Sequence, residues 1–149
     1  MAEWTEPRRA TAADVTAVRR IVEAAYEPWV PIVGMRPIPL EADYEQLIAD
    51  DLVWLVGNPV IGLIVLVDEP GVLLVENVAV HPDRHGQGIG RQLMAFAEDR
   101  ARAAGKKKLR LYTNRKMTSN IALYERLGYV RTDLDEIEGR LAVHLEKVL

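Results

Sequence analysis

Short apolar runs alternate along the chain with amphipathic segments, which predicts strands interspersed with helices. The apolar or alternating runs cover residues 52–56, 60–67, 72–80 and 108–113. Such lengths are typical of strands, and the unbroken run at 60–67 is typical of a strand buried on both faces. Two segments instead carry apolar side chains three or four residues apart, which predicts helices. Their stripes are Val15, Val18, Val22 and Ala25 in the first, and Ile89, Leu93, Phe96 and Ala97 in the second.

The rest of the chain completes an α/β pattern. Thr11 is placed to cap the first helix, and Gly105 to end the second. We expect a short strand at 7–10, a helix at 118–127 ending at Gly128, and final strands at 129–135 and 141–148 joined by a turn at 138–139. Between residues 26 and 44, prolines at 28, 31, 37 and 39 predict a loop, with a second helix beginning near Leu40.

The resulting order, βααβββαβαββ, predicts a single α/β domain over residues 1–149. It has a mixed sheet of about seven strands with four helices, and one parallel βαβ unit at 72–113. The 149 residues are 49% hydrophobic and 28% charged, an ordinary globular balance.

Composition narrows the possible functions. The net charge of −3 argues against a general nucleic-acid binder. The absence of cysteine excludes disulfides and a cysteine nucleophile, and histidines 81, 85 and 144 have no metal-ligand spacing, so no metal is expected. No apolar run could span a membrane, and residues 1–4 lack the features of a signal peptide. We therefore expect a cytoplasmic protein.

Three glycines at alternate positions, 86, 88 and 90, stand where a predicted strand turns into a helix, in HPDRHGQGIGRQL. The first amides of a helix have no internal partner, and glycine lets an anion approach them closely. The pattern predicts a phosphate site, although tight helix–strand packing would also explain it. It matches neither GxGxxG nor the GK[ST] of a P-loop. The KKK run at 106–108 is either a solvated connection or an aid to a phosphate-bearing ligand.

Two motifs carry a resemblance to a known family. The segment VENVAV-HP-DRHGQGIGRQL resembles motif A of the Gcn5-related N-acetyltransferase (GNAT) superfamily, and NIALYERLGY at 120–129 resembles its motif B. The chain departs from the family at His85, where arginine or glutamine is usual, and at Met117, where asparagine is frequent; here the asparagine is Asn120.

The resemblance implies an acetyl-CoA-dependent N-acetyltransferase that acts on a primary amine of a small molecule or peptide by direct transfer. It also implies a V-shaped opening between the fourth and fifth strands. Main-chain groups of Val78, Ala79 and Val80 would hold the pantetheine arm, and Asn120 would face the cofactor. The pyrophosphate would lie on residues His85, Gly86, Gln87, Gly88, Ile89, Gly90 and Arg91.

Two residues are candidates for proton transfer. By resemblance to motif B, Tyr124 is the general acid for the leaving thiolate, since a phenol of pKa about 10 is protonated at pH 7; the alternative is a half-buried core tyrosine. Glu76 interrupts an apolar strand and could accept the amine proton. It would share a face with Val78 and Val80 unless a bulge intervenes. The alternatives are an edge carboxylate or an ion pair, and a desolvated amine could react without a dedicated base.

The acceptor pocket is expected in the proline-rich segment, lined by Tyr26, Trp29, Arg36 and Tyr44. Arg36 could pair with an acceptor carboxylate, or could face solvent, and the aromatic residues could simply pack the loop onto the sheet. The rival functions are a non-catalytic acyl-CoA-binding regulatory module and a nucleotide-binding module. By analogy with the family, the late strands could pair in a homodimer.

Overall fold

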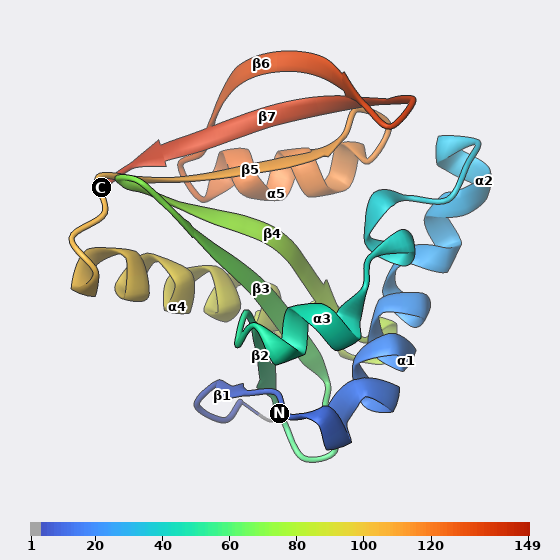
Figure 1. The fold of residues 1–149 in the computed structure, drawn as a ribbon. Helices are drawn as coiled ribbons and strands as arrows, with labels where there is room; N and C mark the ends of the chain where they lie inside the picture. The colour runs from blue at the N-terminus through green and yellow to red at the C-terminus, as the bar shows by residue number, and fades with distance from the viewer. Residues whose placement is uncertain (1–3) are drawn as a thin grey trace.

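The computed structural model describes residues 4–149, so the signal-peptide argument at residues 1–4 falls largely outside it. Its strands form one seven-stranded sheet in the order β1-β2-β3-β4-β5-β7-β6 (Figure 1). Only β4 and β5 are parallel, which confirms the predicted mixed sheet with a parallel βαβ unit. The strands are β1 (Arg8–Arg9), β2 (Val53–Val56), β3 (Gly62–Glu69), β4 (Val72–Val80), β5 (Lys108–Asn114), β6 (Val130–Ile137) and β7 (Arg140–Val148).

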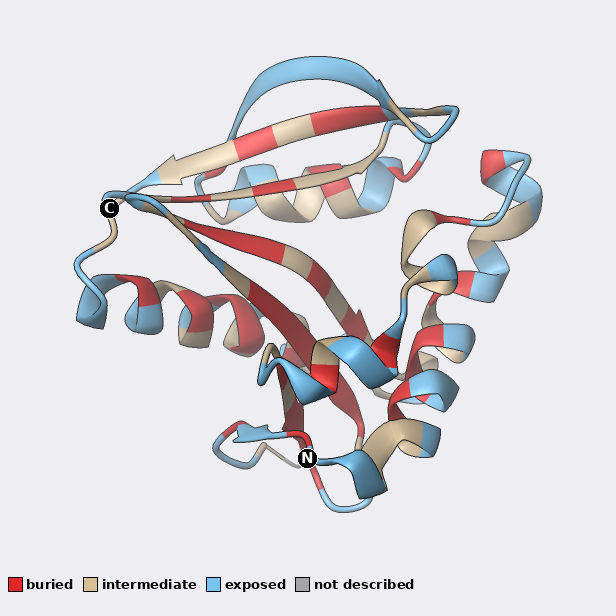
Figure 2. Cartoon of the chain, viewed as in Figure 1, coloured by how far each residue is buried: buried red, intermediate tan, exposed pale blue. Residues whose placement is uncertain are grey.

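Helices cover both faces of the sheet. They are α1 (Val15–Tyr26), α2 (Val30–Val33), α3 (Tyr44–Ala49), α4 (Ile89–Ala103) and α5 (Thr118–Arg126), with four short 3₁₀ segments. One hydrophobic cluster joins α4 and α5 to the sheet, and a second joins α1 and α3 to the opposite face. Burial follows this arrangement, since the middle strands are largely buried whereas β6 is exposed at every residue but its last, Ile137 (Figure 2).

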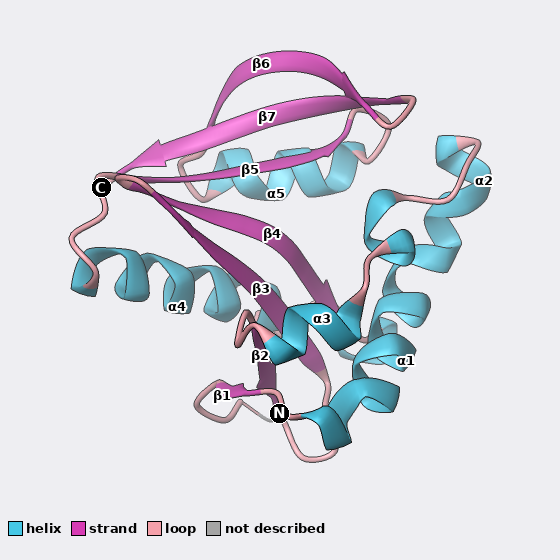
Figure 3. Ribbon diagram, viewed as in Figure 1, coloured by secondary structure: helices cyan, strands magenta, loops and turns pink. Residues whose placement is uncertain are grey.

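The proline-rich segment is more helical than the sequence predicts. It contains two 3₁₀ turns (Glu27–Trp29 and Ile38–Glu41) and the single turn α2, and α3 begins at Tyr44 rather than near Leu40 (Figure 3). Prolines lie in the first positions of these turns, where a missing N–H costs no helical hydrogen bond. The start of α3 is set by Asp43, whose side chain accepts a hydrogen bond from the Gln46 amide at 3.1 Å.

The strands β4 and β5 diverge halfway along their length. They pair only from Val72 with Lys108 to Val75 with Leu111. At the same point β4 carries a bulge, because Val65 and Leu66 of β3 pair with Asn77 and Val75 and leave Glu76 without a partner. The predicted opening between the fourth and fifth strands is therefore present, and it begins beside Glu76.

Candidate active site

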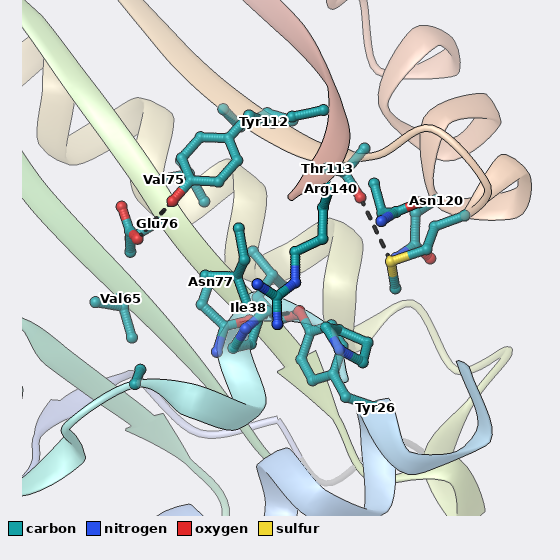
Figure 4. Close-up of a pocket in the computed structure, with 18 of the residues that line it drawn as sticks. Tyr26, Ile38, Val65, Val75, Glu76, Asn77, Tyr112, Thr113, Asn120 and Arg140 are labelled. Atoms are coloured by element: carbon teal, nitrogen blue, oxygen red, sulfur yellow. Dashed lines mark hydrogen bonds between the residues drawn. The ribbon is translucent and has the colours of Figure 1, made fainter. Parts of the chain in front are cut away.

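A cavity of about 300 Å³ lies where β4 and β5 separate. Its wall combines residues of α1, α3, β3, β4, β5, α5 and β7 (Figure 4). Most of the wall is apolar, and the charged residues on it are Asp43, Glu76 and Arg140. Side chains from both faces of the sheet reach the cavity, since α5 packs with the first cluster and α3 with the second. The opening thus connects the two faces at the centre of the fold.

Tyr124 and Asn120 of α5 both line the cavity, as their spacing of one helical turn predicts. The Tyr124 ring packs edge-on against Tyr129, with ring centroids 6.2 Å apart. Burial raises the pKa of the Tyr124 hydroxyl to about 12. At neutral pH this phenol is fully protonated and faces the opening, as a proton donor must.

Glu76 lies on the cavity wall and accepts a hydrogen bond from the Tyr112 hydroxyl of β5 at 2.8 Å (Figure 4). The bulge that would take Glu76 off the face of Val78 and Val80 is present. Those two valines pack with the α4 cluster, and the bulge turns Glu76 toward the opposite face. Burial, followed by the hydrogen bond to Glu76, raises the pKa of Tyr112, so this tyrosine is a donor at the site.

Tyr26 and Tyr44, two of the predicted acceptor-binding residues, line the cavity and form a buried polar network with Asn77. Tyr26 donates to Asn77 Oδ1 and to the Val78 carbonyl, the latter at 3.0 Å. Asn77 Nδ2 donates to the Tyr44 hydroxyl at 3.1 Å, and Tyr44 donates to the Pro39 carbonyl at 2.6 Å. Burial is the first cause of the raised pKa of both tyrosines. Both hydroxyl groups are therefore engaged inside the protein.

Trp29 and Arg36, the other two predicted acceptor-binding residues, are not among the residues lining the cavity. Trp29 packs against the cluster around α1 and α3. The Arg36 guanidinium pairs with Glu27 at 3.3 Å and with Glu41 at 3.2 Å. The arginine that does reach the cavity is Arg140 at the start of β7, which no motif or spacing in the sequence singles out.

The glycine loop after β4 has the backbone that an anion site requires. Gly86 and Gly88 both have φ of +79°, and a Cβ at either position would meet nothing within 4 Å. Positive φ, rather than packing, is therefore what requires glycine at these two positions. Gly90 has no such φ, and a Cβ there would only touch Val80 at 3.8 Å.

The start of α4 offers unpaired amides beside these glycines. Within residues 4–149, the amides of residues 88–91 have no protein hydrogen-bond acceptor, and the first bonded amide is that of Gln92, to Gly88 at 2.9 Å. The side-chain oxygens of Gln87 and Gln92 are buried there, also without a partner in this part of the chain. Open space, free amides and a helix N-terminus together form a site for an anion such as a phosphate.

The neighbouring edge of β4 is also unpaired. The Val78 carbonyl faces Tyr26, and the Val80 carbonyl lies 3.3 Å from His85 Nε2, so both point away from β3. Because the N–H and C=O of one strand residue point to the same edge, the Val78 and Val80 amides face the opening. Ala79 faces β3 and is buried in the second cluster.

The sequence predicts neither a metal site nor a membrane-spanning segment. In the described chain no group of three or more metal-ligating side chains is assembled, and none of its helices combines the length and apolarity needed to cross a membrane. Lys106 and Lys108 lie at the far end of α4 from the glycines, where they pair with Asp68 at 3.6 Å and Glu146 at 3.1 Å. The lysine run is thus the helix-to-strand connection.

Comparison with known families identifies the class of protein that this fold and site define. Residues 16–129 match the sequence profile of the Acetyltransferase (GNAT) family. The chain belongs to the GNAT acetyltransferase family, as the two motifs predict. Acetyl-CoA-dependent N-acetyl transfer, the predicted enzyme class, is the activity of this family.

Curated relatives match over shorter stretches. The chain is 40% identical over 58 residues to a mycothiol acetyltransferase of Streptosporangium roseum, which is 39% of this chain and 17% of the relative. It is 40% identical over 68 residues to an IAA acetyltransferase of Azospirillum brasilense, which is 46% of this chain and 44% of the relative. The matches thus span less than half the length of either relative.

Solved structures show the same fold over nearly the whole chain. An IAA acetyltransferase from Bacillus cereus superposes with a TM-score of 0.74 at 22% identity, covering 97% of this chain and 99% of that one. The PaiA N-acetyltransferase from Thermoplasma acidophilum, in complex with coenzyme A, gives 0.75 at 16% identity, covering 93% and 96%. At this identity the likeness establishes the fold and not the acceptor.

Proposed function

We propose that the protein transfers the acetyl group of acetyl-CoA directly to a primary amine of a small molecule or peptide. One observation carries the proposal: a loop of free amides at the start of α4 adjoins an opening in the sheet that holds a protonated tyrosine and a carboxylate. The loop suits the phosphates of coenzyme A, and the opening suits a reaction between two bound molecules. The absence of cysteine from the sequence is consistent with direct transfer.

The residues present fit acetyl-CoA. The amides from Gly88 to Arg91, with the open space over Gly86 and Gly88, would hold its pyrophosphate. Ile89 and Gly90 belong to this set of free amides, whereas the His85 amide already donates to the Pro82 carbonyl at 3.2 Å. Bound acetyl-CoA supplies the acetyl thioester that the amine attacks.

The free edge of β4 and the cavity wall would hold the rest of the cofactor. The amides of Val78 and Val80 face the opening without a strand partner, and an N–H aimed at an acyl oxygen stabilises the charge that develops there. Ala79 points toward β3, so its main chain takes no part on that edge. Asn120 lies one turn from Tyr124 and adds a polar group beside it.

Tyr124 is the general acid in this proposal. Within residues 4–149 the Tyr124 hydroxyl makes no hydrogen bond to another protein group. The Tyr124 side chain lies on the cavity wall. With a pKa of about 12 it is fully protonated at neutral pH. A thiolate leaving an acetyl group takes up a proton, and Tyr124 is placed to give it.

Glu76 is the proposed base. A lysine-like amine is neutral in only about one molecule in 2,500 at pH 7, so it has to lose a proton before it can attack. Glu76 stands at the mouth of the opening, oriented by Tyr112 at 2.8 Å, with its second oxygen free to accept a proton through water. The predicted cytoplasmic location and homodimer remain predictions.

The test begins with calorimetric titration of the purified protein with acetyl-CoA. Thiol release is then followed against a panel of primary amines. The Tyr124→Phe variant should keep the acetyl-CoA Kd and lose about 10- to 10³-fold in kcat. Tyr129→Phe is the matched control, because that ring touches Tyr124 and lies outside the cavity wall.

Each result has a definite meaning. Binding with thiol release confirms the transferase, and an unchanged kcat in Tyr124→Phe removes this residue as the acid. Binding with no release for any amine favours the regulatory acyl-CoA-binding module. Absence of acetyl-CoA binding would refute the role given to the glycine loop.

A further inference from the structure

Arg140 is held in the cavity wall by main-chain carbonyls. Its Nε and Nη2 donate to the Arg36 carbonyl, at 3.0 and 2.5 Å, and its Nη1 donates to the Glu138 carbonyl at 2.7 Å. The Arg36 carbonyl belongs to the segment between α2 and the following 3₁₀ turn. These three bonds fix the guanidinium plane between the β6–β7 turn and the proline-rich segment.

This anchoring orients the guanidinium without neutralising it. A guanidinium has five N–H groups, so two remain after the three bonds, one on Nη1 and one on Nη2. N–H groups on the two terminal nitrogens of a guanidinium can together bind a carboxylate in bidentate fashion. Among residues 4–149 no carboxylate lies within ion-pair distance of Arg140, whereas Arg36 beside it has both Glu27 and Glu41.

The surroundings of Arg140 restrict which kind of ligand its guanidinium can bind. The cavity that Arg140 lines is mostly apolar, with Ile38, Pro39, Leu141 and Ala142 on its wall, and Figure 4 shows the Arg140 side chain directed into it. An apolar wall leaves the charge without compensation until an anion enters. Glu76 faces the same cavity from β4, so the site offers one group for an amine and another for an anion.

We propose that Arg140 binds the carboxylate of the acceptor, so that the protein acetylates the amine of an amino acid or short peptide with an apolar body. This inference rests on the proposed acetyltransferase activity and specifies its substrate class. The amine of the acceptor lies on the Glu76 side of the cavity, its carboxylate lies on Nη1 and Nη2 of Arg140, and its apolar portion lies against Ile38 and Leu141. The function that sequence analysis gave to Arg36 thus belongs to Arg140, and Arg36 supplies the anchoring carbonyl.

The experiment compares acceptors that differ only in this charge. Thiol release is measured for leucine against leucinamide, phenylalanine against phenylalaninamide, and 5-aminovalerate against its amide. An amine is less basic beside a carboxamide, so chemistry alone favours the amides of the α-amino acids. A higher kcat/KM for the acids in wild-type protein therefore reports recognition of the carboxylate.

Variants then assign that recognition to Arg140. Arg140→Gln should lower the acid-to-amide ratio of kcat/KM about 10- to 100-fold, mostly through KM. Arg131→Gln is the matched control, since this β6 arginine pairs with Glu125 on an exposed surface. Calorimetry with N-acetylleucine and N-acetylleucinamide gives a second readout that needs no turnover, and wild-type protein should bind the acid more tightly.

The possible failures are distinguishable. If amines are acetylated but the acids are not preferred, the inference is wrong and the acetyltransferase proposal stands. If Arg140→Gln lowers acid and amide equally, the residue only anchors the turn, which also overturns the inference. If no amine is acetylated and neither N-acetyl compound binds, the proposed function itself fails. If Arg140→Gln does not fold, the acid-to-amide ratio of kcat/KM in wild-type protein still tests whether the carboxylate is recognised. The Arg140→Lys variant, which keeps the positive charge but loses the bidentate guanidinium, then tests whether Arg140 recognises it.

Discussion

The hydroxyl group of Tyr26, at the end of α1, donates a hydrogen bond to the main-chain carbonyl of Val78 in β4, at 3.0 Å. The same hydroxyl also donates to Oδ1 of Asn77, a residue that is only 6% exposed. These contacts lie directly after the bulge at Glu76. The helix therefore braces the free edge of β4 at the point where that strand separates from β5.

This brace predicts a measurable loss of stability. Tyr26→Phe leaves Asn77 Oδ1 and the Val78 carbonyl without their donor, and a buried acceptor left unsatisfied costs about 1–3 kcal/mol. The free energy of unfolding, measured by urea denaturation, should fall by that amount. Tyr129→Phe is the control, because its hydroxyl lies 3.4 Å from a Glu98 carboxylate that Lys147 already pairs. Equal losses in the two variants would show that the hydroxyl of Tyr26 does not brace the strand.

The glycine loop gives a second prediction, on affinity. Gly88→Ala places a side chain at φ +79° and brings a methyl group into the open space over the free amides. We expect the Kd for acetyl-CoA, measured by calorimetry, to rise at least about 10-fold, with about 1 kcal/mol lost in stability from the strained backbone. Gly88→Glu should abolish binding, because its carboxylate occupies the place of the phosphates.

Gly71 provides a matched control for backbone strain. It lies in the β3–β4 turn with φ +71°, and a Cβ there would also meet nothing within 4 Å. Gly71→Ala should therefore lose similar stability and keep the wild-type Kd. If both alanine variants weaken acetyl-CoA binding alike, strain rather than the anion site explains the effect.

The raised pKa of Tyr124 predicts how the free energy of unfolding changes at alkaline pH. Its pKa is about 12 in the folded protein and about 10 in the unfolded chain, so between these values the folded state keeps a proton that the unfolded state has lost. A raised pKa of this kind contributes stability below pH 10 that is lost as the pH rises toward 12. Over that window the wild-type free energy of unfolding should fall faster than that of Tyr124→Phe, by up to about 1.4 kcal/mol per pH unit. Urea denaturation between pH 8 and 11 measures both slopes, and parallel slopes would mean that the hydroxyl is solvated.

Much of the fold and the class of chemistry could be predicted from the sequence. Hydrophobic periodicity located β4 at its observed bounds and α4 at its observed start, because apolar spacing records which face of each element is buried. The glycines at 86 and 88 were informative because their positive φ is a local requirement. The two GNAT motifs supplied the family.

What escaped prediction depends on contacts between distant segments. The sequence left a bulge at Glu76 as an open alternative, and only the pairing of β3 with β4 decides that it forms. Arg140 reaches the cavity because the Arg36 carbonyl, 104 residues away in sequence, anchors it. The helical turns of the proline-rich segment do not follow from its composition, because proline breaks the interior of a helix and yet is well accommodated in a first turn.

The pH dependence of kcat/KM tests whether Glu76 is the base. Glu76→Gln keeps an oxygen that can accept the Tyr112 hydrogen bond, so the geometry of the wall should be preserved. If Glu76 takes the amine proton, kcat/KM at pH 7 should fall about 10²- to 10⁴-fold. The loss should shrink as the pH approaches 10, because the acceptor amine is then increasingly neutral without help. Glu69→Gln is the control, since Glu69 pairs with Arg110 on β5 and is not among the residues lining the cavity. A loss in Glu76→Gln that stays constant from pH 7 to 10 would mean that Glu76 positions the acceptor without removing its proton.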